Sequence, residues 1–377
     1  MAAKPIAIEL FCGAGGMSLG FKTAGFRIAA AVDNNVTNVK VHKQNFRRCE
    51  TITADLSTLS GADLLRHARV GTQEKLSVLF GGPPCQGFSV GGKHDSADPR
   101  NQLLGHFGRL LDELRPEYFV VENVAGLTLE KHQQTLSNFL ARVRAAGYSY
   151  VDPIQVLDAA DYGVPQSRRR VFILGARIGN VLPKYPAPTT PGGTGPTAWD
   201  ALADLALIDE RIPAEENHFT GTLGIPSAYA LRLRMSKRRA LTLSGCARSK
   251  HTSLTIERFS QTTPGTAEPI SRFFRLAKDR AARTLRAGTG PENGSFTAPR
   301  PIHPVYPRCI TVREAARLHS FPDSFQFDPT IWHAFRQIGN SVPPLLAEQV
   351  AREVMTALRR SGELARRDRR NTTPSTS

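Results

Sequence analysis

The sequence predicts an α/β fold, in which a mostly parallel sheet covered by helices on both faces is joined to a smaller, loop-rich second domain. Through about the first 180 residues, short apolar runs alternate with amphipathic stretches, which is the pattern of strands and helices in such a sheet. After Arg177 the pattern changes: residues 184–197 are rich in Pro, Gly and Thr, as in a linker, and a basic, turn-rich region follows.

The expected elements follow the apolar periods in chain order. Strands are expected at Pro5–Phe11, Arg27–Asp33, Glu50–Asp55, Leu76–Phe80, Glu117–Val121 and Val171–Gly175. Helices are expected at Met17–Ala24, Leu103–Leu114, Gln133–Ala146, Thr311–His319 and Pro344–Leu358. Several of these strands end directly in glycines or polar residues, and ligands of such sheets bind outside the carboxyl ends of the strands. The sequence therefore places a binding site at that edge.

The same pattern gives the domain boundaries. Residues 1–185, completed by 335–360, are expected to form the sheet domain, and 186–334 the second domain. The tail over 361–377 is Arg-rich and then Thr- and Ser-rich, and we expect it to be disordered.

Composition excludes several classes of protein. With 40% hydrophobic and 22% charged residues among 377, the chain reads as globular, and no apolar run is long enough for a membrane span. The first residues lack the features of a signal peptide. The five cysteines are scattered, with none in a CxxC pair, which argues against a disulfide framework or a zinc site. We expect a cytoplasmic monomer without a metal.

The net charge of +16 is concentrated in one block. Residues 221–300 contain 15 lysines and arginines against 4 acidic residues. A concentrated positive charge indicates a polyanionic partner, with nucleic acid as the first candidate and ribosomal or anionic-lipid binding as the alternative.

A Gly-rich turn follows the first strand, at Phe11, Gly13, Gly15 and Gly16. Glycines there let the backbone approach a ligand closely. Asp33 ends the second strand, where a carboxylate can accept hydrogen bonds from ribose hydroxyls. Asp55, at the end of the third, could accept from an adenine amine. An adenosine-bearing cofactor fits this set of residues. The alternative is that the glycines only form a turn and that the aspartate only caps a helix.

Cys85 is the candidate nucleophile. It follows two prolines and a buried strand and precedes several glycines in the sequence GGPPCQGFS. Rigid residues before a thiol and mobile ones after it suit a nucleophile that is presented and then covered. The alternative is an inert, buried cysteine.

Charged residues at two further strand ends complete the candidate site. Glu122 follows an apolar strand, where a carboxylate is costly unless it has a function or a partner. In the segment QSRRR, strand alternation places Gln166, Arg168 and Arg170 on one face. A satisfied ion pair for Glu122 and a solvated edge for the arginines are the alternatives.

The order of motifs resembles that of the C5-cytosine DNA methyltransferases, in their bacterial restriction–modification form. The matching segments are FxGxGG, PPCQGFS, ENV, QSRRR, RxxTVREAARLxxFP and QIGNSVPP. The resemblance covers nearly the whole chain outside the basic block. It implies a Rossmann-like S-adenosylmethionine-dependent methyltransferase sheet with a smaller, loop-rich target-recognition domain. S-adenosylmethionine would be the methyl donor, S-adenosylhomocysteine the product, and a flipped cytosine in double-stranded DNA the acceptor.

The resemblance also assigns roles to individual residues. Cys85 would attack carbon 6 of cytosine, Glu122 would donate a proton or hydrogen bond to N3, and Arg168 and Arg170 would steady the base's carbonyl oxygen and the nearby backbone. The cofactor pocket would be lined by Phe11, Gly13, Gly15, Gly16, Asp33, Asp55, Leu56, Pro84, Leu103, Asn340 and Ser341. The candidate DNA contacts are Gln86, Ser89, Arg232, Arg234, Lys237, Arg238, Arg239, Thr284, Leu285 and Arg286. The segment from Arg308 to Leu318 would organise the recognition domain.

Three other functions compete with this one. A transfer RNA cytosine-5 methyltransferase shares the catalytic motifs, but it carries a Cys-Phe-Thr element that this sequence lacks. A non-enzymatic DNA-binding regulator would not need Cys85 or Glu122. A solitary regulatory DNA methyltransferase, without a cognate restriction endonuclease, remains open.

Overall fold

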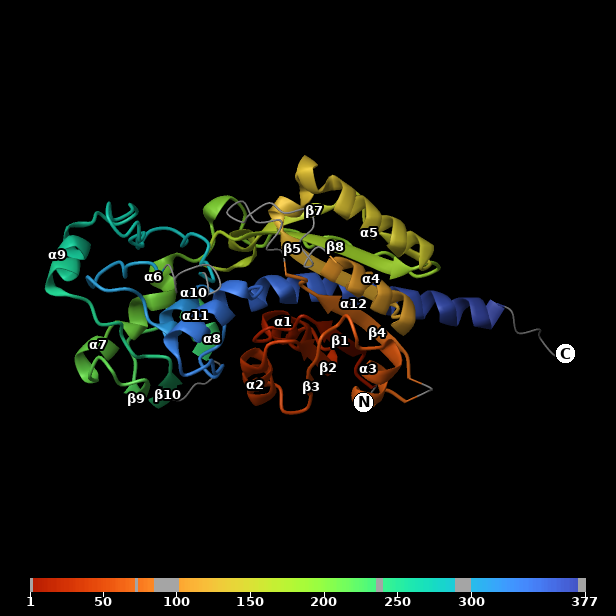
Figure 1. Cartoon of the computed structure of the whole chain (residues 1–377), viewed down its shortest axis with the longest axis horizontal. Helices are drawn as coiled ribbons and strands as arrows, with labels where there is room; N and C mark the ends of the chain where they lie inside the picture. Colours follow the sequence, from red (N-terminus) through yellow and green to blue (C-terminus); the bar gives the residue numbers. More distant parts are fainter. Residues whose placement is uncertain (1–2, 72–73, 85–101, 235–239, 289–299, 372–377) are drawn as a thin grey trace.

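The computed structural model describes residues 3–71, 74–84, 102–234, 240–288 and 300–371. Its centre is an eight-stranded sheet of order β3-β2-β1-β4-β5-β8-β6, with β7 also paired to β8. The strands are β1 (Ile6–Leu10), β2 (Arg27–Asp33), β3 (Glu50–Thr53), β4 (Leu76–Gly81), β5 (Tyr118–Val124), β6 (Tyr148–Tyr150), β7 (Gln155–Asp158) and β8 (Arg169–Arg177). Figure 1 shows this sheet domain beside a second domain along the long axis of the molecule.

The sheet is mainly parallel, as predicted. Strands β1 to β5 pair in parallel, whereas β8 runs antiparallel to β5 and pairs in the same way with β6 and β7. The strand order reverses between β1 and β4, and a crevice opens at such a reversal in doubly wound sheets. The Gly-rich turn after β1 and the prolines after β4 therefore meet at one place. Strand β5 is longer than expected, because Glu122 and Asn123 pair with Phe172 and Val171 of β8.

Helices cover both faces of the sheet. The helices of this domain are α1 (Gly16–Thr23), α2 (Val36–Asn45), α3 (Gly61–His67), α4 (Gln102–Leu114), α5 (Gln133–Ala145) and α12 (Pro344–Asn371). Side chains of α1, α2 and α12 share one hydrophobic core with the sheet, and side chains of α3, α4 and α5 share another. Alternation along β1 divides the strand between them, since Ala7 joins the first core and Ile8 the second.

Helix α12 returns the chain to the sheet domain and packs beside α1. It continues to Asn371, so the expectation of a disordered tail from residue 361 was wrong for 361–371. Its sequence there contains four arginines, which favour helix. Ser361 is also anchored: its hydroxyl bonds Tyr118 Oη at 2.8 Å and accepts from the N–H of Val181 at 2.8 Å. Residues 372–377 lie outside the described part.

The second domain contains short elements joined by long loops, as its turn-rich sequence predicts. They are α6 (Ala198–Leu202), α7 (Ile208–Arg211), β9 (His218–Thr222), α8 (Ala228–Arg234), β10 (Ala240–Ser244), α9 (Ser253–Gln261) and α10 (Val312–Leu318), and α11 (Ile331–Asn340) spans the predicted boundary with the sheet domain. The predicted boundary at 186–334 remains a prediction. Among the described helices, none is long and apolar enough to cross a membrane.

Candidate active site

The Gly-rich turn leaves β1 in a conformation that suits glycine. Gly13 and Gly15 have φ values of 53° and 102°, and Phe11 also has a positive φ of 57°. A Cβ added at Gly13 would meet no atom within 4 Å. The backbone at this point therefore borders open space, which is what close approach to a cofactor requires.

Asp33 lies beside this turn. Its Oδ2 accepts the N–H of Gly13 at 2.9 Å, and its Oδ1 accepts the N–H of Asn35 at 2.9 Å and Asn38 Nδ2 at 3.2 Å. Burial raises the pKa of the carboxyl, against the lowering effect of these bonds. Each carboxylate oxygen can accept further hydrogen bonds, so the position fits a ribose diol, and the residues present fit an adenosine-bearing group.

The other predicted cofactor residues are spread around this edge. Leu56 is buried beneath the end of β3, and its carbonyl accepts from Arg109 Nη2 at 2.6 Å. Asp55 is exposed and accepts the N–H of Ser57 at 2.8 Å, which lowers its pKa. Pro84 and Asn340 are exposed, and Leu103 is half-buried.

Ser341 closes the turn from the far end of the chain. A Cβ added at Gly16 would lie 3.0 Å from Ser341 Cβ and 2.3 Å from the carbonyl oxygen of Val342. Only glycine allows this approach. The C-terminal motif thus packs directly against the Gly-rich turn, and the role of Ser341 in a cofactor pocket remains a prediction.

The carboxyl end of β5 presents a buried ion pair. Arg170 Nε lies 3.0 Å from Glu122 Oε1, and the two side chains are 14% and 10% exposed. Burial raises the pKa of Glu122, whereas Arg170 and then Arg168 act to lower it. A carboxyl with a raised pKa holds its proton at a higher pH than an ordinary glutamate, which is a property of general acids.

The same strand end contacts the residues that precede Cys85. A Cβ added at Gly82 would lie 2.7 Å from Glu122 Oε2, and Asn123 Nδ2 donates to the carbonyl of Pro83 at 3.1 Å. Cys85 itself lies outside the described residues, as do Gln86 and Ser89. Glu122 and Asn123 thus lie against Gly82 and Pro83, which precede Cys85 by three and two residues.

Arg168 takes a different place from Arg170. Burial alternates along QSRRR as expected, with Gln166 and Arg168 fully buried and Ser167 and Arg169 exposed. However, Arg168 Nη1 donates to the carbonyl of Leu285 at 3.1 Å and Nη2 to that of Gly339 at 2.7 Å. Arg168 therefore links the backbone at Leu285 to the backbone at Gly339, whereas Arg170 pairs with the carboxylate of Glu122.

Sequence reasoning missed a buried polar cluster behind the Gly-rich turn. Glu9 in β1 accepts from Ser18 Oγ, His42 Nε2 lies 3.1 Å from Ser18 Oγ, and His42 Nδ1 lies 2.9 Å from Thr51 Oγ1. Burial raises the pKa of Glu9 to about 8 and lowers that of His42 to about 3. A Cβ at Gly15 would meet the His42 ring at 2.9 Å, so the cluster supports the turn. A glutamate within the apolar strand IAIEL was the available signal.

In the second domain, many basic residues are used for folding. Arg234 is nearly buried and donates to Asp204 Oδ2 at 2.6 Å and 3.1 Å and to the carbonyl of Gly224 at 2.7 Å. Arg275 donates to five carbonyl oxygens, which lie in Phe259, Ser260, Thr262, Pro304 and Val305. Some arginines of the basic block therefore donate hydrogen bonds to carbonyl oxygens of the loops. Arg234 forms its ion pair and hydrogen bonds within the protein, so it is not available to DNA.

Among the other candidate DNA contacts, Arg286 is exposed. Arg232 pairs with Glu348 at 3.1 Å, and about half of its side chain remains exposed. Thr284 is also exposed, and its hydroxyl donates to the carbonyl of Ser167. Leu285 is buried. Lys237, Arg238 and Arg239 lie outside the described residues.

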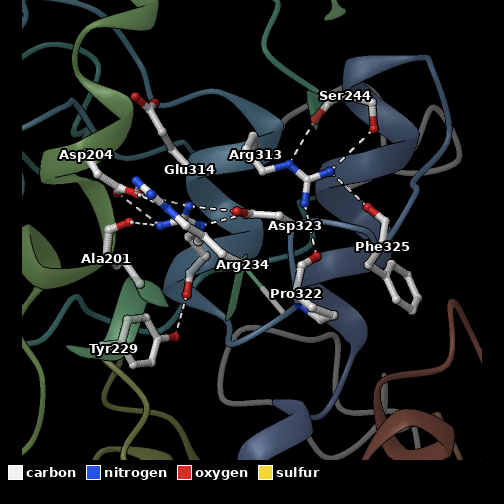
Figure 2. Close-up of polar contacts among 12 residues, drawn as sticks. Ala201, Asp204, Tyr229, Arg234, Ser244, Arg313, Glu314, Pro322, Asp323 and Phe325 are labelled. Carbon is white, nitrogen blue, oxygen red and sulfur yellow. Dashed lines mark hydrogen bonds and ion pairs between the residues drawn. The ribbon is translucent and has the colours of Figure 1, made fainter. Parts of the chain in front are cut away.

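Two further arginines, Arg313 and Arg317, tie α10 to its surroundings, and Figure 2 shows the contacts of Arg313. Arg317 is fully buried and bonds both oxygens of Asp323 at 2.6 Å and 2.8 Å and both oxygens of Asp204 at 3.0 Å and 3.2 Å. Arg313 donates to three backbone carbonyls, those of Ser244, Pro322 and Phe325.

Replacing Arg317 by methionine should therefore destabilise the protein strongly. Asp204 would keep Arg234, but Asp323 would lose its guanidinium, and breaking a buried pair costs about 3–5 kcal/mol. Urea unfolding would measure the change. As a control, Arg232→Met removes an exposed partner of Glu348, which keeps Arg352 at 2.6 Å, and should cost less than about 1 kcal/mol. Equal losses in the two variants would contradict this view of α10.

The mixed α/β fold with its mainly parallel central sheet is that of the S-adenosylmethionine-dependent DNA methyltransferases, which define the class of this enzyme. The chain belongs to the C-5 cytosine-specific DNA methylase family, whose model matches residues 6–356.

Individual relatives agree with this assignment. Over 373 residues the chain is 48% identical to Type II methyltransferase M.XorII of Xanthomonas oryzae pv. oryzae, covering 96% of this chain and 87% of that protein. It is 32% identical over 355 residues to Type II methyltransferase M1.HphI of Haemophilus parahaemolyticus, covering 92% and 86%. A crystal structure of an E. coli prophage protein, assigned as a DNA modification methyltransferase, superposes with a TM-score of 0.77 at 31% identity and covers 94% of this chain and all of that one.

Family membership confirms DNA (cytosine-5) methyltransferase activity and supports the use of S-adenosylmethionine. The family also implies DNA as the substrate.

Proposed function

We propose that the enzyme methylates a cytosine flipped out of a specific duplex sequence, through a covalent bond between Cys85 Sγ and carbon 6 of the base. The observation that carries this proposal is the buried Glu122–Arg170 pair, which lies 3.0 Å apart against the residues that lead into Cys85. A stacked base is closed to attack on its face, so the target must leave the helix.

Each group would have one task. The Cys85 thiolate adds to carbon 6 and makes carbon 5 nucleophilic. After methyl transfer, a base removes the carbon-5 proton and the Cys85 thiolate is expelled, which restores the aromatic ring. Glu122, whose pKa is raised by burial, supplies a proton or hydrogen bond to N3 as charge builds there. Arg170 orients Glu122 and faces the base carbonyl oxygen. S-adenosylmethionine, when bound, supplies the methyl group, and Gly13, Asp33 and the Ser341 segment are the residues that would hold it.

Trapping with 5-fluorocytosine tests this mechanism. A fluorine at carbon 5 cannot leave as a cation, so the bond between Cys85 and carbon 6 should persist after methyl transfer. A denaturing gel should show a protein–DNA adduct that requires S-adenosylmethionine, and peptide mapping should place it at Cys85. An unmodified-cytosine duplex is the control. Failure to form the adduct, with methylation of ordinary DNA intact, would exclude the covalent mechanism.

The region 186–334 is proposed as the target-recognition domain. Its candidate phosphate contacts are Arg232, Lys237, Arg238, Arg239 and Arg286, and such contacts position DNA without reading its sequence. Thr284 and Leu285 would lie near the base-reading residues, with Gln86 and Ser89 on the catalytic side. The buried position of Arg234 removes it from this set.

Neutralising Arg238 and Arg239 together should weaken binding to all DNA sequences. Each lost phosphate contact should also flatten the log–log salt dependence by about 0.9, while the methylated motif stays the same. Replacing residues 221–300 by those of a relative should instead change the motif. Bisulfite sequencing and binding titrations measure both. The proposed assignment of the recognition domain would be wrong if the double variant methylated a different motif. It would also be wrong if the variant with residues 221–300 replaced methylated the same motif as the wild type.

We also propose that methylation protects DNA from a cognate restriction endonuclease that acts on the same site without direct contact. Support comes from the Type II methyltransferases among the relatives. If expression of the enzyme makes cellular DNA resistant to an endonuclease cutting at the methylated motif, this role is supported. The alternative of a solitary regulatory enzyme would be favoured if no nuclease gene accompanied it.

A further inference from the structure

Gln166 occupies a buried position between three segments that are distant in sequence. It precedes β8 and is fully buried. Its Oε1 accepts the N–H of Leu285 at 3.0 Å, and its Nε2 lies 3.0 Å from His319 Nδ1 and 3.3 Å from the carbonyl of Leu318. One amide therefore links the end of α10 to the Thr284–Leu285 segment.

His319 extends this link to the C-terminal motif. Its Nε2 lies 2.9 Å from the carbonyl oxygen of Ser341. The directions of the bonds are fixed at both ends, because the N–H of Leu285 only donates and the carbonyl of Ser341 only accepts. Gln166 therefore donates to Nδ1, and Nε2–H of His319 donates to Ser341. This requires the neutral imidazole, and burial lowers the pKa of His319.

Arg168 forms a second, parallel link. It donates to the carbonyls of Leu285 and Gly339, so that both backbone polar groups of Leu285 are bound by side chains of the QSRRR segment. The segments at the two ends also touch, because a Cβ at Gly339 would lie 2.5 Å from the backbone N of Ala287.

The two ends of these links lie at different ligand sites of the proposed enzyme. One end is Leu285, next to the candidate DNA contacts Thr284 and Arg286. The other is Ser341, whose Cβ would lie 3.0 Å from a Cβ at Gly16 in the Gly-rich turn. A shift of the 284–286 segment must therefore break buried hydrogen bonds or move Ser341 against Gly16. An unmade buried bond costs about 1–3 kcal/mol.

We propose that Gln166 and His319 are positioning residues that couple DNA binding at Thr284–Arg286 to cofactor binding at the Gly-rich turn. The proposal rests on the proposed function, since it takes both ligand sites from it. Neither side chain has to touch DNA or cofactor. The chain of hydrogen bonds fixes the two segments relative to each other, so a ligand that orders one segment favours the bound arrangement of the other.

The test measures coupling between the two ligands. The affinity for a duplex carrying the methylated motif is determined by fluorescence anisotropy, with and without saturating S-adenosylhomocysteine. The wild type should bind DNA at least about 5-fold more tightly with S-adenosylhomocysteine, at the lower end of typical coupling. His319→Phe keeps an aromatic ring but removes both hydrogen bonds, and its ratio should fall to within about 2-fold of one, as expected when the coupling is lost.

Two variants separate coupling from simple damage to the core. His319→Gln keeps one acceptor and one donor and should restore most of the ratio. His303→Phe is the matched control, because His303 is equally buried and, in the described structure, contacts neither ligand segment: its Nδ1 accepts from the N–H groups of Val305 and Tyr306, and its Nε2 lies 3.6 Å from Glu314 Oε1. It should lower the melting temperature and keep the ratio. A ratio near one in the wild type, or a wild-type ratio in His319→Phe, would overturn the proposal.

A failure of the coupling proposal can be distinguished from a failure of the proposed function, because the two are measured separately. The motif and the covalent chemistry are tested by bisulfite sequencing and trapping of the wild type, whereas coupling is read from binding alone. A wild type that forms the adduct but shows no coupling would refute only the role of Gln166 and His319.

Discussion

Replacing Cys85 by serine should lower methyl transfer by at least about 10⁴-fold, the scale on which the loss of a catalytic nucleophile is measured. A serine alkoxide is far harder to form than a thiolate. Binding of S-adenosylhomocysteine and DNA should persist, because the described parts of the cofactor edge, Gly13 and Asp33, do not depend on the thiol. Tritiated methyl incorporation and gel shifts measure the two properties separately.

Cys49→Ser is the matched control for this experiment. Cys49 is a free, buried cysteine whose Sγ lies 3.7 Å from the carbonyl of Glu50, so a serine hydroxyl can donate to the same oxygen. Burial raises the pKa of this thiol to about 12, which makes it a poor nucleophile at neutral pH. The control should retain methyl transfer. Near wild-type turnover in Cys85→Ser would refute the nucleophile assignment.

The central strands β1, β2, β4 and β5 were predictable because they are largely apolar runs, whereas the polar strands β6 and β7, with the sequences YSY and QVLD, were not predicted. Strand β2 was predicted at the residues where it lies, and β4 differs by one residue. Helices α2 and α3 were not predicted. Their apolar periods are weak, and the available signals were the N-cap residues Asn35 and Ser60, whose side chains accept from the N–H groups of Asn38 and Asp63.

The function of individual arginines was less predictable, because sequence gives the position of a charge but not its partner. Arg234 and Arg286 stand in the same basic block, yet the first is buried against Asp204 and the second is exposed. Likewise Arg168 and Arg170 alternate correctly, but Arg168 bonds carbonyls of two distant segments and Arg170 pairs with Glu122. These contacts join residues more than 100 positions apart in the case of Arg168, and no local pattern encodes them.

Glu122→Gln should lower methyl transfer by about 10²–10⁴-fold, the usual contribution of a general acid. Glutamine can still donate a hydrogen bond, but it cannot transfer a proton. The pKa of Glu122 is raised by burial and lowered by Arg170. If the protonated form acts, activity declines as pH rises through this pKa. Arg170→Gln removes the lowering charge, so the decline should move to higher pH although turnover falls at every pH.

The pH dependence of kcat separates this role from a purely structural ion pair. The decline assigned to Glu122 should be absent in Glu122→Gln, because no carboxyl remains to titrate. Glu74→Gln is the control: Glu74 is a half-exposed partner of Arg27 at 3.5 Å, and its loss should leave rate and profile unchanged. If the pair only held β5 to β8, the variants would lose stability but keep the wild-type profile. A shift to lower pH in Arg170→Gln would contradict the acid role, since removing a nearby positive charge can only raise the pKa of Glu122.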